Sequence, residues 1–208
     1  MIKNIVFDMG NVLILFYPKK ILSTILDDEN EIDAILKYFY ATDEYREVDR
    51  GTMTYEQVLD CIKDNLPGHL ISLLKELYVD NCFVSDHMPP FPEMYGLVEK
   101  LKQNGYKVYL LSNATPQFHN YYSKIPVLSL MDGMFVSSDY KLLKPEKEIY
   151  EKFFEVFSLV PEECIFIDDV EENINGGIAC GMDGIVFSPS FDDISVLKDK
   201  LSKKGVKI

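Results

Sequence analysis

The stretch IVFDMGNV, residues 5–12, joins an apolar run directly to an aspartate and a glycine-containing turn. Four further apolar runs rich in β-branched residues, most of them followed by helical patterns, lie at 106–111, 134–136, 164–167 and 184–187. Strands buried on both faces read as continuous apolar stretches, whereas the strands of a half-exposed antiparallel sheet alternate. The sequence therefore predicts an α/β fold with a mainly parallel five-stranded sheet.

The segment between the first and second apolar runs has almost no strand pattern but several helical ones. Within it, the stretch from Thr54 to Gln57 has the spacing of a capping box and opens one of these helical patterns. We therefore expect a small helical bundle inserted into the sheet domain. The predicted division is a core domain of residues 1–16 and 88–208 with an inserted helical-bundle cap of residues 17–87.

The charge of the chain limits its partners. Its 208 residues include 21 basic and 34 acidic side chains, which gives a net charge of −13. Such a charge repels nucleic acid and anionic membranes, so we expect neither as a partner and favour a small-molecule ligand. If that ligand is anionic, the site needs local positive charge from a metal ion, a lysine or helix N-termini.

No sequence feature directs the protein out of the cytoplasm. No apolar run approaches the ~20 residues of a membrane span, and Asp8 breaks the first run before a signal-peptide core could form. We interpret the four cysteines as reduced core residues, because they form no C-x-x-C pair: Cys61, Cys82, Cys164 and Cys180. We expect a cytoplasmic protein that is a monomer or a weak homodimer.

Residues able to do chemistry stand where predicted strands end or where a helix begins. They are Asp8, Ser112-Asn113, Lys144-Pro145 and Asp168-Asp169. Because open α/β sheets bind ligands at the carboxyl ends of their strands, we expect these side chains to share one site. Thr115-Pro116 reads as the N-cap and first residue of a helix beside that site.

These residues form a set suited to phosphoryl transfer. The Asp8 carboxylate would attack phosphorus and form an aspartyl-phosphate, but it needs a cation to offset the repulsion between two anions. Mg²⁺ prefers a few carboxylate or carbonyl oxygens, which Asp8, one aspartate of the 168–169 pair and a backbone carbonyl would provide. Lys144 would neutralise phosphate charge, and Ser112 with the following N–H groups would hold the remaining oxygens.

Four motifs, in their order along the chain, resemble those of the haloacid dehalogenase-like hydrolase superfamily. They are Asp8-x-Gly-Asn-Val, Leu-Ser112-Asn113, Lys144-Pro145 and Phe-Ile-Asp168-Asp169. The resemblance spans nearly the whole chain, including the helical cap. Within the superfamily, the chain resembles most the bacterial α-D-glucose-1-phosphate phosphatase type. This likeness rests on Gly-Asn-Val after the nucleophile, on the cap stretch Arg50-Gly-Thr-Met-Thr54 and on the Asp-Asp-x-x-x-Asn that ends at Asn173.

The resemblance implies a Rossmann-like three-layer core with strand order 5-4-1-2-3 and Asp8 as the nucleophile. It also implies that Mg²⁺ is bound by Asp8, the backbone carbonyl of Gly10 and Asp169. Asp168 would be a second acidic neighbour or an indirect ligand.

The same resemblance implies that Ser112, Asn113 and Lys144 hold the phosphoryl group. One position departs from the superfamily's pattern, in which most phosphatases carry a second aspartate two residues after the nucleophile as general acid and base. Here that position is Gly10, which keeps the backbone carbonyl but has no side chain to transfer a proton. Because positioned proton transfer contributes ~10²–10⁴-fold, we expect a slower phosphatase or a substrate with a good leaving group, such as glucose 1-phosphate.

Other polar and aromatic residues have ordinary interpretations. His119 and His87 are alternatives for the missing proton donor, although an exposed or otherwise satisfied histidine is the simpler interpretation of each. Phe16, Tyr17 and Arg46 lie near the cap entrance, where packing or solvation is simpler than a role in specificity.

Three functions remain open at this point. The first is a Mg²⁺-dependent phosphatase of a small phosphorylated metabolite, with a sugar phosphate favoured. The alternative is a metal-independent 2-haloacid dehalogenase in which Asp8 attacks carbon, because dehalogenases also lack the second aspartate. The pair at 168–169 argues against it, since carboxylates beside the nucleophile would repel one another without a cation. A non-catalytic relative that binds a phosphorylated ligand is the third.

Overall fold

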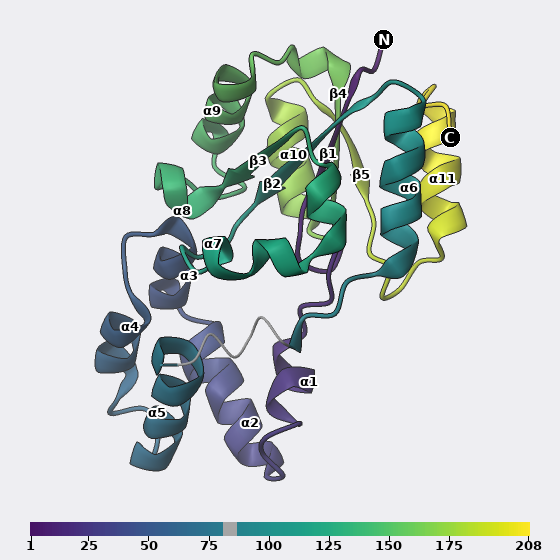
Figure 1. The fold of residues 1–208 in the computed structure, drawn as a ribbon. Coiled ribbons are helices and arrows are strands. Elements are labelled where there is room, and N and C mark those ends of the chain that lie inside the picture. The colour runs from purple at the N-terminus through teal and green to yellow at the C-terminus, as the bar shows by residue number, and fades with distance from the viewer. Residues whose placement is uncertain (81–86) are drawn as a thin grey trace.

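A five-stranded sheet forms the centre of the computed structural model, which describes residues 1–80 and 87–208 (Figure 1). All neighbouring strands pair in parallel, in the order β3-β2-β1-β4-β5. Read from the other edge, this order is 5-4-1-2-3, so the predicted fold and strand order are confirmed. The strands are β1 (Asn4–Phe7), β2 (Lys107–Ser112), β3 (Gly133–Val136), β4 (Cys164–Asp168) and β5 (Asp183–Val186).

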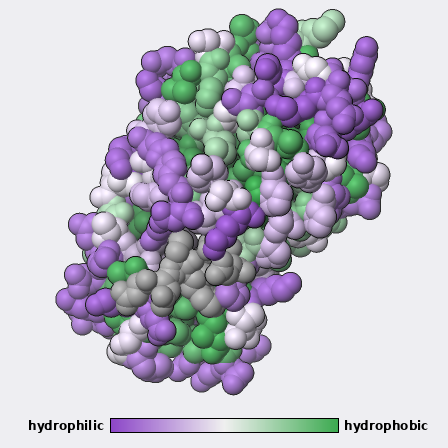
Figure 2. All heavy atoms as spheres, viewed as in Figure 1, coloured by the Kyte–Doolittle hydropathy of each residue, from purple (hydrophilic) through white to green (hydrophobic). Residues whose placement is uncertain are grey.

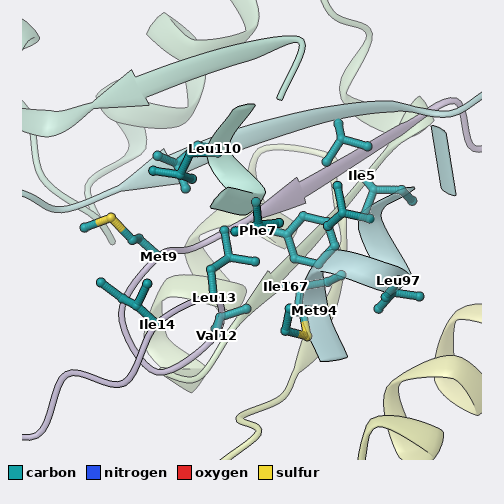
Figure 3. Close-up of a cluster of buried hydrophobic side chains, with 14 of the residues drawn as sticks. Ile5, Phe7, Met9, Val12, Leu13, Ile14, Met94, Leu97, Leu110 and Ile167 are labelled. Atoms are coloured by element: carbon teal, nitrogen blue, oxygen red, sulfur yellow. The ribbon is translucent and has the colours of Figure 1, made fainter. Parts of the chain in front are cut away.

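Helices cover both faces of the sheet. Side chains alternate along β1, so successive residues are buried on opposite faces. Ile5 and Phe7 are buried in the apolar layer beneath α6 (Pro92–Gln103) and α11 (Ile194–Lys203) (Figure 3). Val6, which lies between them, is buried on the opposite face, beneath α9 (Lys147–Phe157) and α10 (Glu171–Ala179). Burying each such side chain stabilises the fold by roughly 1.5–3 kcal/mol. The two apolar layers therefore hold β1, and the residue that follows it, in a fixed position.

Short helical elements complete the core: α7 (Phe118–Tyr121), η4 (Tyr122–Lys124), η5 (Pro126–Leu130), α8 (Ser137–Tyr140) and η6 (Pro161–Glu163). The helix predicted to begin at Thr115-Pro116 begins at Phe118, so that prediction is wrong. The Phe118 N–H donates to the Thr115 carbonyl in a turn (3.0 Å), and the Thr115 hydroxyl donates to Gln117 instead of capping a helix.

A second group of helices lies below the sheet in Figure 1 and has its own apolar cluster. It consists of α1 (Pro18–Leu22), α2 (Glu29–Ile35), η1 (Leu36–Tyr40), α3 (Asp43–Arg50), α4 (Tyr55–Ile62), α5 (Gly68–Lys75) and η2 (Glu76–Asp80). The predicted capping box is confirmed, because Thr54 and Gln57 bond each other's backbone at the start of α4. We call these elements the cap; its predicted boundaries at 17 and 87 stay a prediction.

The cysteines need one correction. Cys164 is buried, as expected, whereas Cys61 is exposed, because it lies on the outer side of α4 while its neighbours Leu59 and Ile62 face the cap interior. Cys180 is partly buried, and Cys82 lies outside the described residues.

Hydrophilic side chains cover much of the face seen in Figure 2, with hydrophobic ones scattered between them. Across residues 1–80 and 87–208, every helix is too short or too polar to cross a membrane.

Candidate active site

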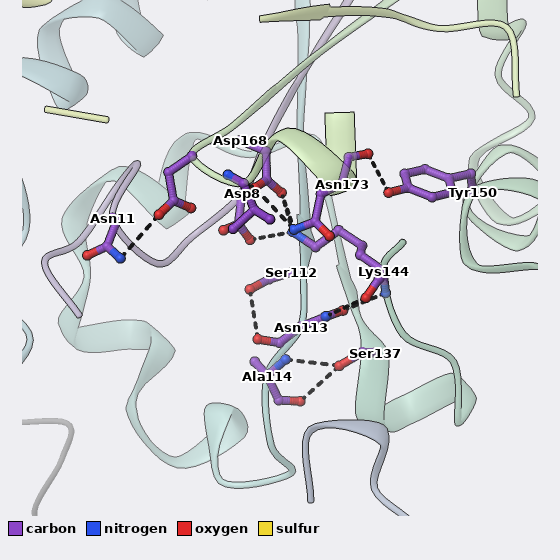
Figure 4. Close-up of polar contacts among 12 residues, drawn as sticks. Asp8, Asn11, Ser112, Asn113, Ala114, Ser137, Lys144, Tyr150, Asp168 and Asn173 are labelled. Carbon is purple, nitrogen blue, oxygen red and sulfur yellow. Dashed lines mark hydrogen bonds and ion pairs between the residues drawn. The ribbon is translucent and has the colours of Figure 1, made fainter. Parts of the chain in front are cut away.

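Asp8 lies directly after β1, and parallel pairing places it beside the end of β4. Phe7 is opposite Ile167, and the Asp8 N–H donates to the Ile167 carbonyl (2.8 Å). Asp168 is the last residue of β4 and is buried, as is Asp8. The two carboxylates are therefore neighbours at the carboxyl edge of the sheet, as the positions of the predicted strands imply (Figure 4).

Lys144 joins these two carboxylates. Its Nζ lies 2.8 Å from Asp8 Oδ1 and 2.7 Å from Asp168 Oδ2, and its side chain is only 1% exposed. Asn113 fixes the lysine's backbone from both sides, because it accepts from the Lys144 N–H (2.9 Å) and donates to the Lys144 carbonyl (3.1 Å). The ammonium group is thus held against Asp8 by contacts within the protein.

Asp168 has its oxygens committed to the protein. Besides Lys144, it accepts from the Val170 N–H (2.8 Å) and from Asn173 Nδ2 (3.1 Å to each oxygen). Asn173 is held in turn, because its carbonyl accepts from the Tyr150 hydroxyl (2.6 Å). Asp168 is therefore placed to position Lys144 (Figure 4).

Asp169 is less committed than Asp168. It is partly exposed, and its carboxylate accepts a hydrogen bond from Asn11 Nδ2 at 3.3 Å. Asn11 is itself oriented, because its Oδ1 accepts from the Phe16 N–H (3.1 Å).

These carboxylates fit a divalent cation. Ligand oxygens of Asp8, Asp168 and Asp169 lie within 4.8 Å of one another. Hard cations such as Mg²⁺ take such oxygens together with carbonyls and water, so the donor set suits that ion. Gly10 lies beside this cluster, since it lines the same cavity as Asp8 and Asp169.

The pKa values reflect the crowding of charge. Burial raises the pKa of Asp8 to about 7; Lys144 opposes that rise and Asp168 adds to it. The pKa of Asp169 is also raised, by burial first and then by Asp168. Burial disfavours the charge on Lys144, but the two carboxylates outweigh burial and raise its pKa. A bound cation would favour the ionised carboxylates and lower their pKa values.

A cavity of about 300 Å³ lies between the core and the cap. One side, here called the strand wall, consists of Asp8, Asn11, Asn113, Lys144, Asp169 and Asn173. The opposite side, here called the cap wall, consists of Tyr45, Asp49, Tyr55, Leu77 and Tyr78. The cap wall is largely aromatic: the Tyr55 ring centroid lies 5.0 Å from that of Tyr78 and 6.0 Å from that of Tyr45.

The other residues singled out from the sequence do not all line the cavity. Ser112 is buried, its hydroxyl donates to the Asn113 carbonyl (3.5 Å), and it is not part of the cavity lining. His119 bonds Asp139 at an exposed position (2.9 Å). His87 lines a second, smaller hollow together with Tyr17.

Phe16 does line the main cavity, whereas Arg46 is exposed. The sequence reasoning missed the cap wall, Asp49 above all. The sequence feature that could have indicated Asp49 is its position directly before the Arg50-Gly51 stretch.

Comparison with known proteins identifies the family. Residues 2–181 match the family model described as haloacid dehalogenase-like hydrolase. The sesquiterpene phosphatase astK of Aspergillus oryzae is 28% identical over 200 residues, which cover 90% of this chain and 91% of that protein. The D-ribitol-5-phosphate phosphatase of Bacteroides thetaiotaomicron is 25% identical over 193 residues, covering 88% and 90%.

Solved structures share the fold. A variant of the Bacteroides thetaiotaomicron enzyme bt-2542, in complex with magnesium and inorganic phosphate, superposes with a TM-score of 0.70 at 23% identity and covers 95% of this chain and 99% of that one. The L-2-haloacid dehalogenase of Xanthobacter autotrophicus reaches 0.66 at 15% identity, covering 100% and 85%. Because the family model spans most of the chain and both curated relatives are named phosphatases, this protein belongs to the haloacid dehalogenase-like hydrolase family as an enzyme of the phosphatase type.

Proposed function

We propose that this protein is a Mg²⁺-dependent phosphatase of a small phosphorylated metabolite that works through an aspartyl-phosphate on Asp8. The observation that carries the proposal is the placement of three groups around one cavity. Asp8 and Asp169 line it, and Lys144 contacts Asp8 at 2.8 Å. A nucleophile, a cation site and a phosphate-neutralising charge are the parts that phosphoryl transfer needs.

The strand wall supplies these parts. The Asp8 carboxylate would attack phosphorus in line with the leaving oxygen, and Lys144 and Asn113 would hold the phosphoryl oxygens. Ser112 would join them after its hydroxyl turned from the Asn113 carbonyl. When bound, Mg²⁺ would neutralise charge on the nucleophile and the phosphoryl group.

The cation would be held by Asp8, Asp169 and the backbone carbonyl of Gly10. Of the two consecutive aspartates, Asp169 is the better direct ligand, because the oxygens of Asp168 already accept from Lys144, Val170 and Asn173. Asp168 would contribute indirectly by fixing Lys144.

The substrate is proposed from the cavity. Glucose 1-phosphate suits an enzyme with glycine at position 10, since its anomeric hydroxyl is a better leaving group than an ordinary alcohol. The aromatic cap wall favours a second candidate, a monophosphate with an apolar organic group, because Tyr45, Tyr55 and Leu77 offer apolar surface to it.

Phosphate release tests the proposal. Glucose 1-phosphate, ribitol 5-phosphate, a prenyl monophosphate and p-nitrophenyl phosphate are each incubated with the enzyme in Mg²⁺ or in EDTA. We expect Mg²⁺-dependent release from at least one ester and a loss of ~10³-fold or more in Asp8→Asn. Asp27→Asn, at an exposed position, is the matched control. Acid quenching followed by mass spectrometry is expected to find a phosphorylated peptide containing Asp8.

Two results would overturn the proposal. One is an absence of phosphate release from the whole panel; the other is an Asp8→Asn variant as active as the parent. The dehalogenase alternative predicts halide release from 2-chloropropionate that EDTA does not reduce, and that result would replace phosphatase activity with dehalogenation.

A further inference from the structure

The proposed reaction leaves one proton unassigned, and the following inference rests on that proposed function. When the bond between phosphorus and the leaving oxygen breaks, an alkoxide departs slowly unless a proton reaches it in the same step. Gly10 has no side chain to deliver one. Asp8 is the nucleophile, and Lys144 is tied to Asp8 and Asp168.

Asp49 is a carboxyl group on the opposite side of the same cavity. It belongs to α3 of the cap and lines the cavity together with Asp8. Across the described residues, no group donates a hydrogen bond to its carboxylate. A partly buried carboxyl group that faces a ligand cavity without a partner is free to exchange a proton with the ligand.

Contacts with the core hold Asp49 in this place. The Asp49 carbonyl accepts from the Ser137 hydroxyl (2.5 Å), and the Gly51 carbonyl accepts from Lys141 Nζ. Between them, Arg50 makes a two-pronged ion pair with Glu146, at 2.8 and 2.6 Å. Three consecutive cap residues are therefore fastened to the core, so the position of Asp49 over the site does not depend on a substrate.

Other proton donors are less suitable. Burial raises the pKa of Tyr45 and of Tyr55 well above that of an ordinary tyrosine, which makes each a weaker acid. His119 bonds Asp139 outside the cavity, and His87 lines a different hollow.

We propose that Asp49 is the general acid and general base of this enzyme, supplied by the cap in place of a side chain at position 10. As an Asp8 oxygen bonds to phosphorus, the bond from phosphorus to the leaving oxygen breaks, and the Asp49 proton passes to that oxygen. The Asp49 carboxylate then accepts a proton from the water that attacks the aspartyl-phosphate. This second step releases inorganic phosphate and restores both aspartates.

The electrostatic surroundings agree with this role. Burial raises the pKa of Asp49 to about 7, and the charge of Asp8 adds to the rise, while Arg46 and Lys144 oppose it. The charge of Asp49 in turn contributes to the raised pKa values of Tyr45 and Tyr55. A pKa near neutrality allows Asp49 both to donate and to accept a proton within one turnover.

The test compares leaving groups. In Asp49→Asn, we expect kcat/KM for an alkyl phosphate or a sugar phosphate to fall ~10²-fold or more, while kcat/KM for p-nitrophenyl phosphate, whose leaving group needs no proton, changes by less than about fivefold. The ratio kcat/KM reports the transfer to Asp8, whereas hydrolysis of the aspartyl-phosphate is common to both substrates and affects only kcat. The decline of kcat/KM toward alkaline pH is expected to disappear with the alkyl substrate. Asp43→Asn is the matched control, because Asp43 lies on the same helix with its side chain 97% exposed.

A second variant separates proton transfer from a structural effect. Among the residues that the structure describes, a Cβ added at Gly10 would meet only the Phe16 Cβ, at 3.8 Å, so the site has room for a side chain. Gly10→Asp in the Asp49→Asn background is expected to restore the alkyl phosphate rate by ~10-fold or more.

Three results would overturn the inference: equal losses of kcat/KM with both kinds of leaving group, no loss with either, or no rescue by Gly10→Asp. Each of these results is interpreted only when the parent enzyme releases phosphate and that release depends on Asp8. They are therefore distinct from a failure of the proposed function, in which the parent itself releases no phosphate or Asp8→Asn is fully active.

Discussion

The strand wall and the cap wall of the cavity differ in how their polar groups are satisfied. On the strand wall, Asp8 is paired with Lys144, and Asn113 and Asn173 hold the groups around them. On the cap wall, aromatic rings pack against one another and the Asp49 carboxylate has no described hydrogen-bond donor.

This difference suggests a division of labour. A network whose members are all bonded is rigid and can hold a nucleophile, a cation site and a phosphate in fixed geometry. A wall of aromatic side chains offers shape and apolar surface to a substrate. Substitutions in it can change which substrate binds without disturbing that geometry. Reaction chemistry would then belong mainly to the strand wall and substrate choice to the cap wall.

Removing the central charge of the strand wall is expected to have the largest effect. Lys144→Met leaves Asp8 and Asp168 buried beside each other without a cation. Breaking such a buried pair costs ~3–5 kcal/mol, so the free energy of unfolding in urea without Mg²⁺ is expected to fall by about that much. Phosphate release should fall by ~10²–10³-fold. Lys152→Met, which loses only a surface pair with Glu155, should stay near the parent; equal stability of the two variants would contradict the fixed strand wall.

Removal of Mg²⁺ tests the strand wall in a second way. Mg²⁺ at 100 times its dissociation constant is expected to raise the free energy of unfolding by ~2.7 kcal/mol, and EDTA to reverse this. Asp169→Asn should lose most of the increase, whereas Asp199→Asn, on the exposed side of α11, should keep it. An undiminished Mg²⁺ effect in Asp169→Asn would remove Asp169 from the proposed ligand set.

A change in the cap wall should alter substrate preference more than catalysis. Tyr55→Leu removes an aromatic ring that packs on Tyr45 and Tyr78. We expect kcat/KM for a prenyl or aryl monophosphate to fall ~10-fold, which corresponds to about 1.4 kcal/mol, with a smaller change for glucose 1-phosphate. Tyr95→Leu, at an exposed position on α6, is the control. Equal losses with both substrates would contradict the division of labour.

The smallest expected effect concerns pH and stability in EDTA. The pKa of Asp49 rises from 3.8 to about 7 in the folded protein, so folding favours its protonated form. The resulting stabilisation is fully present below the unfolded value and is lost as pH rises through about 7.

Unfolding in urea at pH 5 and pH 8 measures this contribution. We expect the parent to gain more stability than Asp49→Asn on going from pH 8 to pH 5, by about 1 kcal/mol because the group is partly exposed. Asp43→Asn should follow the parent. Identical pH dependence in the parent and Asp49→Asn would mean that the folded protein does not favour the neutral Asp49 carboxyl.

Local sequence patterns predicted some features and failed on others. The capping box at Thr54 was predictable because both of its bonds join residues three positions apart. The helix start at Thr115 was wrong, since the same residue types also form turns and a competing Thr115–Gln117 bond replaced the cap. Cys61 was assigned to the core because it forms no C-x-x-C pair, although its position on α4 decides its exposure.

The choice between Asp168 and Asp169 shows where sequence reasoning stops. Both follow the same strand and carry the same side chain, so their order alone does not separate their roles. Only the bonds from Lys144 and Asn173 distinguish them, because these come from other elements and occupy the oxygens of Asp168.

By itself, the sequence determined that Asp8, Lys144 and the 168–169 pair would meet, because the carboxyl ends of parallel strands, and the loops that follow them, lie at one edge of a sheet. It did not determine what faces them. Asp49 and the tyrosines of the cap wall come from helices whose orientation depends on distant contacts, such as the pair between Arg50 and Glu146, 96 residues apart. Only the tertiary structure, by packing the cap against the core, brought the Asp49 carboxyl group, to which none of the described residues donates a hydrogen bond, opposite Asp8.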